Sequence, residues 1–181
     1  TNNLSKGITI ASPAPTETAA PTPTPTPIPE ARIAQGDLAL FQGEYERGRQ
    51  EYLKAALGSQ DIEIQASAML GIGRAYFEEY NYTQAVETFK SLINEHPANQ
   101  SLANAYYFLA ESYMQQQMPA EAAEAYAKYL ELKPGVLDDI IQKRRAEALM
   151  AAGNYTGAIE AYQAVITAGS DRGQALIKIG Q

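Results

Sequence analysis

The chain has 181 residues, a formal net charge of −7, a pI near 4.8 and no cysteine. An acidic chain without a basic stripe lacks the charge that neutralises phosphates, so DNA and RNA are disfavoured as partners. The missing cysteines exclude disulfides and thiolate metal sites, and no apolar run approaches the roughly 18 residues that would suggest a membrane span.

Residues 1–29 are predicted to form an extended N-terminal arm. Threonine and proline alternate along residues 11–29, which removes backbone donors and favours polyproline II geometry at about 3.1 Å per residue. Ahead of this stretch, Leu4, Ile8 and Ile10 have the alternation of a short strand with one apolar side, and we expect them to contact a protein surface.

The location of the protein is expected from the same arm. A Thr/Pro-rich spacer is typical of exported proteins, so an extracellular or bacterial cell-envelope location is expected. The chain starts at Thr1 without a charged-then-apolar signal peptide, which fits either a leader that has been removed or a sequence without one.

Residues 30–181 are predicted to be helical throughout and repetitive. Apolar residues recur at three- and four-residue spacing, and the turn at 42–45 recurs at 79–82, 116–119 and 152–155. Positions 45, 82, 119 and 155 are therefore spaced by 37, 37 and 36 residues. This period predicts four helix-turn-helix units over about 30–61, 62–98, 99–135 and 136–170, with a partial fifth at 171–181.

Small and aromatic residues follow the same period. Two antiparallel helices approach closely only where side chains are small, so we expect the small positions to be helix crossing points with aromatic rings beside them. The small set is Gly36, Gly73, Ala110 and Ala146 in the first helices and Gly48, Ala85, Ala122 and Ala158 in the second; the rings are Tyr52, Phe89, Tyr126 and Tyr162. Pro97 and Pro134 are expected to close the second and third units.

Residues 89–97 and 126–134 resemble the second helix and exit turn of the tetratricopeptide repeat (TPR) family. The resemblance covers about residues 30–181 and implies an all-α solenoid of four repeats plus one extra C-terminal helix, with protein partners. The long period is similar to that of bacterial envelope members of the family.

Units one and four depart from the family pattern. Arg32 and Gln142 replace its bulky early residue, and Gln35 and Arg145 replace its leucine. These two units are expected to pack less tightly than the others.

The resemblance also implies a concave groove lined by the first helices. An extended apolar peptide suits this set better than a C-terminal carboxylate, because the Lys, Arg and Asn clamp of chaperone-binding members is missing. The alternative is that some of these side chains belong to the core. The groove positions are Ile33, Asp37, Leu40, Phe41, Leu70, Arg74, Phe77, Tyr107, Glu111, Met114, Ile140, Lys143, Glu147 and Met150.

Candidate chemistry is sparse, so we expect no enzyme, no cofactor and no metal site. His96 is the only histidine, and the adjacent Glu78 and Glu79 point about 100° apart on a helix. Glu111 and Ser112 are similar to the acid motif of lytic transglycosylases but lie inside a repeat helix. No nucleotide-binding, zinc or calcium motif occurs.

Asn3, Asn81, Asn99 and Asn154 each begin an Asn-x-Ser/Thr triplet and are candidate glycosylation sites, although asparagine also favours turns for backbone reasons. The basic run Lys143-Arg144-Arg145 could meet acidic groups of a partner or form a solvated helix face.

Self-assembly is the functional hypothesis. Leu176, Ile177 and Ile179 make a poor polar cap for the last unit, and the arm could cross onto a neighbour. Head-to-tail contacts of this kind predict an open filament. The alternatives are a monomeric peptide-binding adaptor and a helical scaffold fragment of a larger envelope enzyme such as a lytic transglycosylase.

Overall fold

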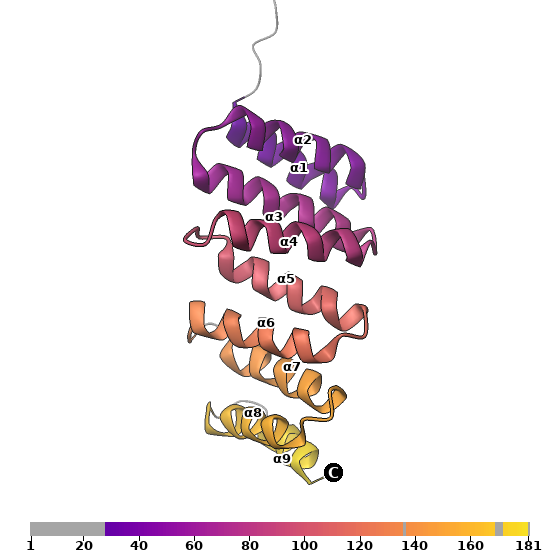
Figure 1. The fold of residues 1–181 in the computed structure, drawn as a ribbon, viewed down its shortest axis with the longest axis vertical. Coiled ribbons are helices and arrows are strands. Elements are labelled where there is room, and N and C mark those ends of the chain that lie inside the picture. Colours follow the sequence, from indigo (N-terminus) through magenta and orange to yellow (C-terminus); the bar gives the residue numbers. More distant parts are fainter. Residues whose placement is uncertain (1–27, 136, 169–171, 181) are drawn as a thin grey trace, which may run out of the picture.

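The computed structural model describes residues 28–135, 137–168 and 172–180, and its regular structure within these ranges is entirely α-helical. Successive helices pair and the pairs stack along one axis, from α1 at one end to α9 at the other (Figure 1). We call the pairs units 1 to 4. Unit 1 is α1 (Pro29–Phe41) with α2 (Tyr45–Gly58), unit 2 is α3 (Ile62–Glu78) with α4 (Tyr82–Glu95), unit 3 is α5 (Leu102–Gln115) with α6 (Pro119–Leu132), and unit 4 is α7 (Asp138–Ala151) with α8 (Tyr155–Ala168); α9 (Arg172–Ile179) follows.

Several helix starts are explained by local sequence. Pro29 and Pro119 occupy first-turn positions, where a missing N–H costs nothing. Asp61 caps α3, since its Oδ1 accepts the Glu63 N–H at 2.8 Å. Because Pro29 is the first residue of α1, the helical region begins one residue earlier than the sequence indicated.

The turn inside each unit repeats the same backbone geometry. One residue of each turn has a positive φ: 75° at Gly43, 62° at Tyr80, 60° at Gln117 and 77° at Gly153. The N–H of the following residue then donates to the carbonyl five residues back, over 2.8 to 2.9 Å, which satisfies a helix-end carbonyl. Glycine adopts this backbone freely, whereas a side chain there costs about 1–2 kcal/mol.

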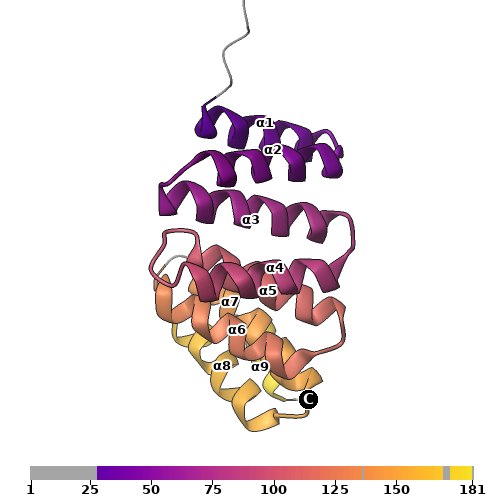
Figure 2. The same cartoon turned by 45° about the horizontal axis from the view of Figure 1, so that its top comes forward.

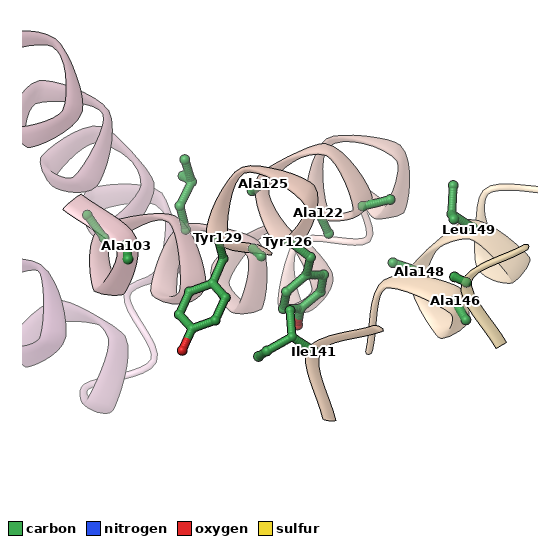
Figure 3. Close-up of a cluster of buried hydrophobic side chains, with 14 of the residues drawn as sticks. Ala103, Ala122, Ala125, Tyr126, Tyr129, Ile141, Ala146, Ala148 and Leu149 are labelled. Atoms are coloured by element: carbon green, nitrogen blue, oxygen red, sulfur yellow. The ribbon is translucent and has the colours of Figure 1, made fainter. Parts of the chain in front are cut away.

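The crossing points predicted from the repeat are confirmed. The aromatic rings of the second helices are 0 to 2% exposed, and all eight small residues are buried. A Cβ on Gly36 would lie 2.6 Å from the Tyr52 ring, and a Cβ on Gly73 would lie 2.3 Å from the Phe89 ring. Figure 3 shows this packing in the second half of the solenoid, where Tyr126 lies beside Ile141 of the next unit.

The Tyr52 and Phe89 rings also meet the first helix of the next unit. A Cβ on Gly71 of α3 would lie 2.5 Å from the Tyr52 ring. At the equivalent position of α5, Phe108 stacks on Phe89 with ring centroids 5.9 Å apart. The residue at this seam is therefore fitted to the ring that it covers, and successive units lie side by side as Figure 2 also shows.

The polar residues that depart from the family pattern have different environments in units 1 and 4. In unit 1, Arg32 forms a 2.9 Å ion pair with Glu51, and both side chains are under one-fifth exposed. In unit 4, Gln142 Oε1 and Arg145 Nε are buried and have no hydrogen-bond partner among the described residues. Within the part of the chain that the structure describes, Arg32 therefore has a partner for its charge, whereas these atoms of Gln142 and Arg145 have none.

Candidate protein-binding surfaces

The predicted groove residues lie on α1, α3, α5 and α7, but most of them are half-buried. Six of the nine apolar positions pack against the hydrophobic cores: Ile33, Leu70, Phe77, Tyr107, Met114 and Met150. Leu40 is also half-buried, whereas Phe41 is 91% and Ile140 is 50% exposed. The surface of the groove is therefore less apolar than its sequence positions suggest.

Carboxylates in the groove are tied to the second helices. The Tyr52 hydroxyl donates to Asp37 Oδ1 and the Tyr126 hydroxyl donates to Glu111 Oε1, each at 2.7 Å. Burial, and then the accepting carboxylate, raises the pKa of both tyrosines well above the ordinary value. In unit 2 the same two positions hold Arg74 and Phe89, so a cation replaces the carboxylate where the hydroxyl is missing.

Predicted groove residues line at least two hollows. The first, of about 480 Å³, is lined by Asp37, Leu40, Phe41, Tyr45, Arg74 and Glu78. The second, of about 400 Å³, is lined by Asp139, Ile140, Lys143, Arg144, Glu147 and Val165. Both mix apolar side chains with both signs of charge, which suits a peptide that carries charged groups.

The basic run that the sequence analysis identified begins at the second hollow. Lys143 and Arg144 line it, and Arg144 Nε lies 3.3 Å from Glu111 Oε1 of unit 3. One of the three cations is thus committed to an ion pair between neighbouring units.

The predicted assembly residues of α9 are only partly covered. Leu176 is 52% and Ile177 is 62% exposed. Ile179 is half-buried and lines a hollow of about 360 Å³ together with Met150 and Tyr162. The other predicted assembly residues, Leu4, Ile8 and Ile10, lie outside the described residues.

The asparagines of the Asn-x-Ser/Thr triplets differ in environment. Asn81 and Asn154 are exposed and cap α4 and α8, with Oδ1 accepting the N–H of Gln84 and of Gly157. Asn99 is only 7% exposed and its side-chain amide donates to the His96 carbonyl, so it is not open to a glycan in this conformation. Asn3 lies outside the described residues.

An exposed apolar residue that sequence reasoning missed is Leu38 on α1, which is 53% exposed. At the equivalent positions of the next three units, Ala75, Ser112 and Ala148 are 0% exposed, since the preceding unit covers them. The 37-residue period does contain this signal, because it places leucine in unit 1 at the position where the other three units have alanine or serine.

The residues weighed as catalytic have structural roles. Ser112 is fully buried and donates to the Phe108 carbonyl at 2.7 Å, while Glu111 accepts from Tyr126. His96 terminates α4 by donating its backbone N–H to Leu92. Across 28–135, 137–168 and 172–180, no cluster of three or more His, Cys, Asp or Glu side chains is grouped to hold a metal ion. No described helix has the length and apolar character to cross a membrane.

Comparisons with known proteins agree with the architecture. A tetratricopeptide repeat profile matches residues 33–101 and 138–181, and a second one matches residues 103–136. No curated protein sequence matches the chain.

Solved structures with a similar fold include three that are 18–20% identical to the chain. One is the crystal structure of MamA protein, with 20% identity, a TM-score of 0.65, and coverage of 84% of this chain and 79% of that chain. MamA 41-end from Desulfovibrio magneticus RS-1 is 19% identical, with a TM-score of 0.62 and coverage of 79% of this chain and 77% of that chain. Pseudomonas aeruginosa PilF is 18% identical, with a TM-score of 0.66 and coverage of 83% of this chain and 65% of that chain. At this identity the likeness concerns the fold alone. With its profile matches and its paired helices, the chain belongs to the tetratricopeptide repeat family, whose fold is a scaffold for protein–protein interaction.

Proposed function

We propose that the chain is a non-enzymatic structural protein, exported to the cell envelope or beyond, whose solenoid associates end to end with further copies of itself. The distribution of exposed large apolar side chains supports this. Among the described residues, six lie in 28–62, six in 137–180 and only Tyr80 and Leu132 between them. Exposed apolar side chains that gather in one region favour an interaction site there, so the end units of the solenoid are the proposed contact surfaces.

The internal packing supports a second copy as the occupant of these ends. Within the chain, each unit covers the first helix of the next, and this burial is complete at Ala75 and Ala148. At α1 the equivalent face presents Leu38, which a preceding unit from another copy would bury. A contact between α1 of one copy and the Leu176–Ile177 end of another is heterologous, so it extends into a filament unless the rotation closes a ring.

The arm and its sugars belong to the same proposal. Leu4, Ile8 and Ile10 would bind the neighbouring copy and strengthen the contact, and the exposed Asn81 and Asn154 would be the glycan acceptors. Mass spectrometry of the protein purified from its native host would detect a glycan at these two sites.

The experiment is analytical ultracentrifugation of the full chain with one variant at each end. Leu38→Glu blocks the α1 face and Ile177→Glu blocks the α9 end. Leu132→Glu is the matched control, because Leu132 is also a half-exposed leucine (46%) but lies in the middle of the solenoid.

The unaltered chain and Leu132→Glu are expected to form oligomers that grow with concentration, whereas each blocked variant alone forms markedly smaller species. An equimolar mixture of the two blocked variants is expected to form larger species than either variant alone, since each supplies one intact end. A monomeric unaltered chain at every concentration, or equal loss of oligomers in Leu132→Glu, would refute end-to-end association.

Peptide binding in the groove is a second candidate function, and Phe41 favours it. This side chain is 91% exposed at the edge of the 480 Å³ hollow, next to Arg74 and Glu78. A synthetic peptide of residues 1–10 is a suitable probe, since its Leu4, Ile8 and Ile10 are the apolar residues predicted to bind a protein surface. Binding that is lost in Phe41→Asp while the chain remains monomeric would identify an adaptor rather than a filament subunit.

A further inference from the structure

A third surface lies on another face of the solenoid, between α4, α5 and α6. A hollow of about 300 Å³ has an apolar floor of Ile93, Tyr106, Leu109 and Tyr113. On α5 this stripe is rotated by roughly 140° from the groove residues, at 100° per residue. The hollow is therefore distinct from the groove, and it lies between units 2 and 3, away from α1 and α9.

The rim of this hollow carries balanced charge. Lys90 and Lys128 line it together with Glu121 and Glu124, so the two signs offset each other. Lys128 is already paired with Glu131 at 2.7 Å. A ligand without net charge would cover these groups without leaving an unpaired charge of its own.

The two tyrosines give the hollow a specific chemistry. Tyr106 and Tyr113 are seven residues apart on α5, which places them about 10.5 Å apart along the helix. Burial, and then Glu121 and Glu124, raises the pKa of Tyr113, so its hydroxyl stays protonated and can donate. Grooves that bind proline-rich peptides are lined by aromatic rings, and in this hollow the two rings also carry hydroxyl groups that can donate hydrogen bonds.

We propose that this hollow binds the Thr/Pro-rich segment, residues 11–29, of a neighbouring copy. One polyproline II turn of three residues spans about 9.3 Å, close to the rise of about 10.5 Å between Tyr106 and Tyr113 along α5. Its backbone carbonyls have no internal hydrogen bonds and would accept from the tyrosine hydroxyls. Apart from Glu17, whose charge the Lys90 ammonium on the rim would offset, the segment is uncharged.

A neighbouring copy is the favoured source of the segment. Pro25, Pro27 and Pro29 restrict the backbone up to the first turn of α1, and Ile28 is extended with φ −64° and ψ 156°. Because proline fixes φ at Pro25, Pro27 and Pro29, an immediate return of the segment to its own solenoid is disfavoured. The proposal stands apart from end-to-end stacking, since it uses neither Leu38 nor α9.

The test is fluorescence anisotropy of a labelled synthetic peptide of residues 11–29, titrated with the full chain. Tyr106→Ala removes one ring of the floor. Asn94→Arg blocks the hollow from an exposed position on its rim and leaves the core untouched, so the test stands even if Tyr106→Ala unfolds. Thr167→Arg is the matched control, since Thr167 is exposed at the same position of α8, where no such tyrosine pair lies beside it.

Saturable binding is expected to weaken by roughly tenfold or more in Tyr106→Ala and Asn94→Arg and to be unchanged in Thr167→Arg. A peptide with every proline replaced by alanine is expected to bind the unaltered chain no more tightly than the natural peptide binds Tyr106→Ala or Asn94→Arg. The proposal is overturned if the unaltered chain shows no saturable binding, if Asn94→Arg binds normally, or if the alanine peptide binds as well as the natural one.

Discussion

Replacing Gly73 by alanine perturbs the contact between the two helices of unit 2. The new Cβ would lie 2.3 Å from Phe89 Cε1 and 2.7 Å from Cζ, closer than a methyl group and an aromatic carbon can approach. The ring cannot rotate away freely, because Phe89 is 0% exposed and stacks on Phe108. The helices must therefore separate.

The magnitude follows from two opposing effects. Overpacking of a well-filled core costs about 1–3 kcal/mol, and a contact this short belongs at the upper end. Alanine regains about 1 kcal/mol of helix propensity relative to glycine. We expect Gly73→Ala to lower the free energy of unfolding by about 2 kcal/mol, which corresponds to a fall in Tm of about 4–8 °C for a domain of this size.

Urea denaturation followed by circular dichroism measures the change, and two variants control it. Gly58→Ala is the same substitution at a helical site whose nearest neighbour is Pro29 Cγ at 3.8 Å, so it should be neutral or stabilising. Phe89→Leu combined with Gly73→Ala removes the ring edge and should cost less than the sum of the single changes. If Gly73→Ala is as stable as the natural chain, the ring does not fill the crossing point and the reasoning fails.

Three further predictions concern the turns, the seams and the tyrosines. Gln117→Gly should stabilise the chain by about 1 kcal/mol in urea denaturation, since it relieves a positive φ of 60° at an exposed side chain. Arg49→Ala should destabilise it by about 1–2 kcal/mol, because this 13% exposed side chain reaches Glu79 at 2.6 Å and the Tyr76 ring at 4.5 Å; Arg47→Ala, at 60% exposure, should change little. The raised pKa values of Tyr52 and Tyr126 mean that their stabilisation is complete below about pH 10, the unfolded pKa, and is lost as the pH rises above it. Unfolding monitored against pH should be less steep on the alkaline side in Tyr52→Phe/Tyr126→Phe, and an unchanged slope would contradict this assignment.

The fold could be predicted from the sequence because its rules are local and repeated. Small residues at a fixed period marked every helix crossing, and glycine at 43 and 153 marked two of the four turns. Tyr80 and Gln117 adopt the same backbone without being glycine, so only the period identified their turns.

The groove was less predictable, since position along a helix does not determine exposure. Phe77 and Tyr107 occupy groove positions, yet both pack against Phe108. For Phe77 this ring belongs to the next unit, and for Tyr107 it is the neighbouring residue on the same helix. The hydrogen bond from the Tyr126 hydroxyl to Glu111 likewise joins α6 to α5, and the repeat pattern does not indicate that these two side chains meet. Such contacts depend on side-chain reach in three dimensions, which the period does not encode.

The fitted seams have a consequence for how such a chain can change its length. Gly71 is the residue that gives the Tyr52 ring its space, and Phe108 is the residue that stacks on Phe89. Deleting residues 62–98 would join unit 1 to unit 3 and press Phe108 against Tyr52, where even a Cβ is too close. Gain or loss of a single repeat by recombination would therefore have to be accompanied by a change at the seam residue, so the order of units is inherited together with their contacts.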